Sequence, residues 1–195
     1  MKKLLTFSLS LLSCLSLLAQ SQIAVNEPEF IGQAIYLEND STGILLQKEY
    51  ASVESKLKGS SYIPFALTGG VNVYLSVNNR YSPNKISSTS KSIKFIIRCP
   101  NNDYDPYSFI RLAIFEQKKS KRRFKFMKAT ILNGTSSKVE ASYIPFVATK
   151  FGRSSYLLEI ETNNLIKEGE YAIITSVGGA VIIGHSQSIL TFGYY

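Results

Sequence analysis

The sequence contains no tryptophan, one histidine and two cysteines. Zinc centres are built mainly from cysteine and histidine, so the chain has too few of these ligands for an ordinary zinc site. It also has no G-x-S-x-G segment, the turn that carries the serine nucleophile of many hydrolases. These features predict a protein that is not an enzyme and that uses no metal ion or cofactor.

A hydrolase of unusual design is the alternative in the enzyme class. It would use His185 with Ser186 or Cys99, or the pair Glu159 and Glu161, which the two-residue period of a strand places on one face. No spacing favours the His185 set, whereas the two glutamates could stand at the separation that glycosidases use. The same carboxylate spacing is typical of the solvated face of a strand.

The N-terminus has the pattern of a secretory signal peptide. Lys2 and Lys3 are followed by an apolar run, interrupted only by Ser, Thr and Cys, that ends at Ala19. We expect residues 1–19 to be removed and the protein to be exported to the periplasm, the cell surface or the exterior. The competing hypothesis is a lipoprotein acylated at Cys14, but the apolar residues after Cys14 favour an ordinary signal peptide. No transmembrane span is expected, because the run is too short.

Only Cys99 remains after that cleavage, so no disulfide can form within the chain. It ends a strand-like run, and this position predicts a small buried side chain rather than a reactive thiol.

Short runs rich in Val, Ile, Tyr, Phe and Thr, separated by Gly, Asn, Asp, Ser and Pro, predict an all-β protein. No segment keeps a helical period. The expected strands cover residues 30–38, two stretches within 43–55, 71–77, 92–99, 108–116, 123–132, 154–161, 170–176 and 189–195.

The segment SYIPF occurs twice, at 61–65 and 142–146. Three further blocks recur in the same order: IGQAIY with IRLAIF, NVYLSV with SSYLLEI, and KFIIRC with EYAIITS. We therefore predict a Greek-key-like β-sandwich over 24–195, made of tandem halves at about 30–100 and 109–177 with a final strand at 189–195. Tyr62 and Tyr143 would occupy equivalent structural positions. Two small β domains divided near 101–108 are the alternative.

The segment IKEGEYAI places Gly169 two residues before Tyr171. It resembles the tyrosine corner of immunoglobulin-like domains, although Glu168 stands where that motif prefers proline. The resemblance implies that the Tyr171 hydroxyl bonds to backbone a few residues upstream.

The segments PEFIG, DPYSFIR, SSYLLEIE and GEYAI together resemble a type of small secreted protein of Gram-negative gut bacteria. That type has no established activity. The resemblance therefore implies the fold and the export, and it implies no mechanism.

The formal net charge is +8, and basic residues concentrate between 118 and 125. This segment is predicted to be a hairpin tip, either simply solvated or a contact for an anionic envelope surface. Nucleic acid is not expected for an exported protein. The basic side chains are Lys118, Lys119, Lys121, Arg122, Arg123 and Lys125.

Asn101, Asp103 and Asp105 offer oxygen ligands of the kind that calcium takes. Asn and Asp also form turns by bonding to their own backbone, which explains the same residues without an ion.

The sequence thus predicts an exported, non-enzymatic binding or envelope-associated structural module. A carbohydrate-binding or adhesion domain is the alternative, using the basic hairpin and loop tyrosines such as Tyr81, Tyr104 and Tyr107.

Overall fold

The computed structural model describes residues 23–57, 70–87, 91–130, 136–138, 143–162, 167–175 and 186–195. Over these residues the chain is nearly all β, with one four-residue helix, α2 (Pro106–Phe109). Each strand expected from the sequence is present, with ends shifted by a few residues. The expected signal peptide with Cys14, and the residues Tyr62 and His185, lie outside the described part.

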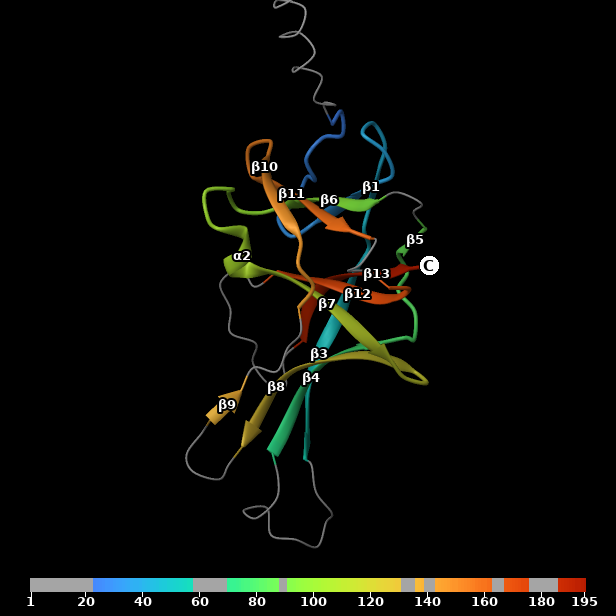
Figure 1. Cartoon of the computed structure of the whole chain (residues 1–195), viewed down its shortest axis with the longest axis vertical. Coiled ribbons are helices and arrows are strands. Elements are labelled where there is room, and N and C mark those ends of the chain that lie inside the picture. The colour runs from blue at the N-terminus through green and yellow to red at the C-terminus, as the bar shows by residue number, and fades with distance from the viewer. Residues whose placement is uncertain are drawn as a thin grey trace, which may run out of the picture.

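One sheet has five antiparallel strands in the order β10-β11-β6-β1-β2. Figure 1 shows it lying across one end of the described body. Its strands are β1 (Ala34–Leu37), β2 (Gly43–Leu45), β6 (Ser92–Arg98), β10 (Val147–Phe151) and β11 (Ser155–Glu161).

The other sheet closes into a barrel. The strands run in the order β12-β7-β8-β4-β3-β13, and β12 pairs again with β13, so this path has no open edge. Two short strands attach to it, β5 to β13 and β9 to β8. The members are β3 (Lys48–Leu57), β4 (Gly70–Asn78), β5 (Lys85–Ile86), β7 (Ile110–Gln117), β8 (Lys121–Thr130), β9 (Ser136–Lys138), β12 (Gly169–Thr175) and β13 (Ser186–Tyr194).

The prediction of an all-β fold with two packed layers is confirmed, with one change: one layer is a barrel and not an open sheet. Sequence period shows which strands exist, but closure depends on a pairing between β12 and β13 that no local pattern encodes.

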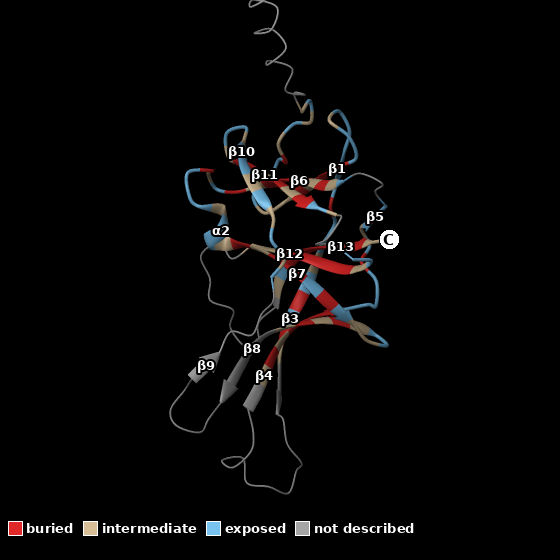
Figure 2. Cartoon of the chain, viewed as in Figure 1, coloured by how far each residue is buried: buried red, intermediate tan, exposed pale blue. Residues whose placement is uncertain are grey.

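Two apolar cores result from the alternation of side chains along the barrel strands (Figure 2). On β13, Leu190 and Phe192 face the five-stranded sheet, where they pack against residues such as Phe95 and Tyr156. Ile189 of the same strand faces the barrel interior. The barrel wall made of β7, β12 and β13 therefore separates the two cores.

Strands from both predicted halves share each sheet. In the five-stranded sheet β6 lies beside β11, and in the barrel β4 lies beside β8. Within each half, the first and last strands pair antiparallel, β1 with β6 and β7 with β12. The origin of the halves as tandem copies stays a prediction.

Tyr171 fixes the chain at the start of β12. Its hydroxyl donates to the carbonyl oxygen of Lys167 and accepts from the Lys167 amide at 2.9 Å. The ring stacks on Phe192 with centroids 5.3 Å apart. The upstream bond expected of this tyrosine is thus present, while a relation to immunoglobulin-like domains stays a prediction.

Candidate functional site

β7 and β8 leave a common turn and then separate. They pair only at Glu116 with Arg123 and at Gln117 with Arg122. The register of β8 with β4 skips one position between Lys125 and Met127, which is a bulge. Because a bulge bends its strand, β8 turns away from β7.

A segment from elsewhere in the chain takes the vacated place beside β7. Tyr143 forms an isolated antiparallel bridge with Ala113, and the Ile144 amide donates to the Leu112 carbonyl at 2.8 Å. The two strands and this segment form a fork in the barrel wall.

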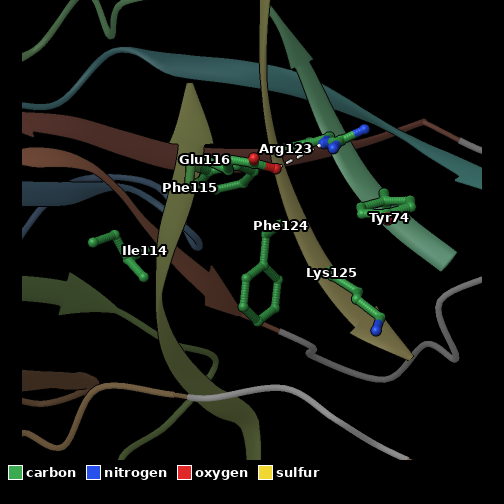
Figure 3. Close-up of a pocket in the computed structure, with 7 residues that line it drawn as sticks. All are labelled: Tyr74, Ile114, Phe115, Glu116, Arg123, Phe124 and Lys125. Carbon is green, nitrogen blue, oxygen red and sulfur yellow. Dashed lines mark hydrogen bonds and ion pairs between the residues drawn. The ribbon is translucent and has the colours of Figure 1, made fainter. Parts of the chain in front are cut away.

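The fork contains an open hollow of about 460 Å³, which we call the fork groove. In Figure 3, Phe124 lies between the diverging strands, with Ile114 on one side and Lys125 and Tyr74 on the other. The residues that line the groove are Tyr74, Ile114, Phe115, Glu116, Arg123, Phe124 and Lys125.

Aromatic rings line the fork. Phe115 and Phe124 meet edge to face with ring centroids 6.2 Å apart. The ring of Tyr143 also packs on Phe124, with centroids 5.6 Å apart. Ile114 adds an aliphatic side chain that is 43% exposed. Phe115 and Phe124 are themselves buried, at 5% and 6% exposed, and form the floor of the groove. The apolar surface that a ligand could contact comes from Ile114 and the partly buried Tyr74.

Charged groups complete the groove. The Nε atom of Arg123 donates to Glu116 at 3.0 Å, and the guanidinium carbon of Arg123 lies 4.7 Å from the centre of the Tyr74 ring. A hydrogen bond from Lys118 and the charge of Arg123 lower the pKa of Glu116, although partial burial opposes them. At neutral pH the groove thus holds an ionised acceptor beside a guanidinium that is fixed on two sides.

Compared with known proteins, the chain matches no family model, no curated protein and no solved structure.

The predicted basic hairpin is present, but its charges are not simply solvated. Lys118 and Arg123 pair with Glu116, and Lys121 pairs with Glu54 at 2.6 Å. Lys119 is exposed in the turn. Glu116, just before the turn, and Glu54, which is distant in sequence, therefore neutralise much of the segment.

Arg122 differs most from its predicted place in an exposed basic hairpin. Its side chain is 1% exposed, and it points into the barrel and contacts Glu49 and Glu170. The prediction that Arg122 contacts an anionic surface is therefore wrong. Side chains alternate along β8, so Arg122 and Phe124 point inward while Lys121 and Arg123 point outward.

The buried Arg122 belongs to a polar network at one end of the barrel. Glu170, with its side chain fully buried, accepts from the Arg122 Nη1 atom at 2.7 Å, from the Ser82 amide at 2.8 Å and from the Tyr195 hydroxyl. Glu49 accepts from Thr191. Buried charges need such pairing, so the network is a structural element rather than an exposed site.

The proposed calcium residues have partners within the protein. The Asn101 side chain accepts from the Asp103 amide at 3.3 Å, Asp103 pairs with Lys150 at 3.2 Å, and Asp105 accepts from the Tyr107 amide as the N-cap of α2. No group of three or more His, Cys, Asp or Glu side chains suited to a metal ion occurs in the described part of the chain. The turn interpretation accounts for these residues.

Cys99 and Glu159, two candidates for a catalytic role, have structural surroundings that explain them without catalysis. Cys99 is buried, and burial raises the pKa of its thiol to about 11, so the reactive thiolate is disfavoured near neutral pH. Glu159 accepts a hydrogen bond from Ser92 at 2.6 Å.

No helix in the ranges that the structure describes is both long and apolar enough to cross a bilayer.

Proposed function

We propose that the chain is an exported, non-enzymatic binding module and that the fork groove binds an acidic carbohydrate. The observation that carries the proposal is the combination of accessible apolar surface, from Ile114 and Tyr74, with the fixed Arg123–Glu116 pair in one hollow of about 460 Å³. Export is supported by the signal-peptide pattern of the first 19 residues.

The chemistry of sugars matches this arrangement. A sugar ring has an apolar C–H face, which packs on aromatic and aliphatic side chains such as Tyr74 and Ile114, and hydroxyl groups that need donors and acceptors. The ionised Glu116 accepts from hydroxyls. A guanidinium carries five N–H donors, so the Arg123 bond to Glu116 leaves others for a ligand.

The charge of the groove favours an acidic sugar over a neutral one. Arg123 and Lys125 contribute two positive charges to the lining and Glu116 contributes one negative charge. Bidentate guanidinium–carboxylate contacts are among the strongest charge-assisted hydrogen bonds. A uronate or a sulfated sugar is thus the chemical class that the lining recognises.

The test is calorimetric titration of the protein lacking residues 1–19 with oligogalacturonate, a heparin oligosaccharide and a neutral cello-oligosaccharide. We expect binding of an acidic ligand that weakens as salt is raised. Arg123→Gln should weaken it about 10-fold or more, because a hydrogen bond to a charged group contributes roughly 1.5–3 kcal/mol.

Lys119→Gln is the matched control, since it removes the same charge from the same hairpin at an exposed position outside the groove. Its affinity should stay within about 2-fold of the parent, as expected for a screened charge. Absence of binding to every acidic ligand, or equal weakening by the two variants, would contradict the proposal.

A further inference from the structure

A second hollow, of about 270 Å³, lies along the first part of β7. We call it the upstream hollow. Its walls are the exposed ring of Tyr107 from α2, the β7 residues Ile110, Arg111 and Leu112, and the segment 143–146.

The side chains in this hollow are held in place. Tyr107 stacks on Phe146 with centroids 5.3 Å apart, and its hydroxyl accepts from the Ala148 amide at 3.1 Å. The Nη1 atom of Arg111 donates to the carbonyl oxygens of Ile110, at 2.9 Å, and Tyr107. The upstream hollow therefore repeats the chemistry of the fork groove: aromatic faces beside a positioned guanidinium.

Tyr143 connects the two hollows. The centroid of its ring lies 5.6 Å from that of Phe124 in the fork groove. The guanidinium carbon of Arg111 lies 5.7 Å from the centroid of the Tyr143 ring. Ile110 of the upstream hollow and Ile114 of the fork groove are four residues apart on β7, a distance of about 13 Å at the rise of a strand.

We propose that the two hollows are subsites of one elongated site, which binds an extended acidic oligosaccharide along β7. This inference rests on the proposed function. Charge complementarity supports it: Arg111 supplies a positive charge to the upstream hollow, as Arg123 and Lys125 do to the fork groove. A chain with repeated acidic groups can engage both hollows, whereas a short ligand fills one.

The test is affinity as a function of ligand length, using oligogalacturonates from the dimer to the octamer. Affinity should rise by about 10-fold or more at the length that first reaches both hollows, because the second contact is then intramolecular. Arg111→Gln should abolish this rise and leave the affinity of the short ligand within 2-fold of the parent. Lys150→Gln, a charge-matched change of an exposed residue that lines neither hollow, should preserve the rise.

Hydrogen exchange of the unmodified sequence gives a second readout that needs no variant. Residues 143–148 should gain protection with the octamer and not with the dimer. Two results would overturn the two-subsite arrangement and leave the proposal of a single site in the fork groove intact. One is equal affinity for ligands of all lengths, and the other is an equal loss of affinity for dimer and octamer in Arg111→Gln. No binding at any length would overturn the proposed function itself.

Discussion

Arg122→Ala is expected to lower the free energy of unfolding by about 3–5 kcal/mol, the typical cost of removing one partner from a buried ion pair. The Arg122 side chain is 1% exposed, and the side chains of Glu170 and Glu49 are 0% and 12% exposed. Without the guanidinium, two carboxylates remain in the barrel end with little water to replace it. Urea unfolding monitored by circular dichroism measures the change.

A triple variant separates the charge effect from simple loss of packing. Arg122→Met combined with Glu49→Gln and Glu170→Gln keeps similar volumes and leaves no buried charge. Replacing a whole buried ionic group by neutral residues is often close to neutral in energy, so the triple variant should be clearly more stable than Arg122→Ala. A loss below about 1 kcal/mol for Arg122→Ala would contradict the assignment of Arg122 to a buried network.

Acid is expected to destabilise the protein through Glu27. Burial raises the pKa of this carboxyl, but hydrogen bonds from the Ser155 hydroxyl and the amides of Arg153 and Ser154, with the charge of Arg98, outweigh burial and lower the pKa to about 2. Since the folded pKa is below the unfolded one, the stabilisation is complete above about pH 4.5 and is lost as the pH falls towards 2.

The contribution is about 2–3 kcal/mol, because each pKa unit corresponds to 1.36 kcal/mol and the Glu27 side chain remains 17% exposed. Glu27→Gln should lower the stability at pH 7 by a similar amount and flatten its dependence on pH between 4.5 and 2. Glu29→Gln, at an exposed position two residues away, is the matched control. Equal pH dependence in the parent and Glu27→Gln would show that the Glu27 contacts do not stabilise the fold.

Much of the strand content was predictable because short-range alternation encodes it. The run at 170–176 was placed within one residue of β12 (Gly169–Thr175), and the run at 92–99 within one residue of β6 (Ser92–Arg98). The sequence pattern does not reveal β5 and β9, because strands of two and three residues are too short to show a period. It also does not reveal β10, whose residues are all exposed or only partly buried and therefore show no apolar alternation. The four-residue helix α2 was missed because it is also too short to show a period, although Asp105 followed by Pro106 is a helix-start signal.

The candidate site was only partly predictable. The cations Arg123 and Lys125 were singled out, but Tyr74 and Tyr143 reach the fork from distant parts of the sequence, and the fork itself depends on a bulge that no residue type announces. The burial of Arg122, in contrast, can be predicted from the local sequence. In KRRFK, an inward Phe124 requires an inward Arg122, since side chains two apart share a face of a strand.

A crystal structure of the complex with an oligogalacturonate would show directly whether the fork groove binds an acidic sugar. We expect a sugar ring packed against Tyr74 or Ile114, with its carboxylate within hydrogen-bonding distance of Arg123 or Lys125. A ligand bound elsewhere on the protein, with the groove empty, would contradict it.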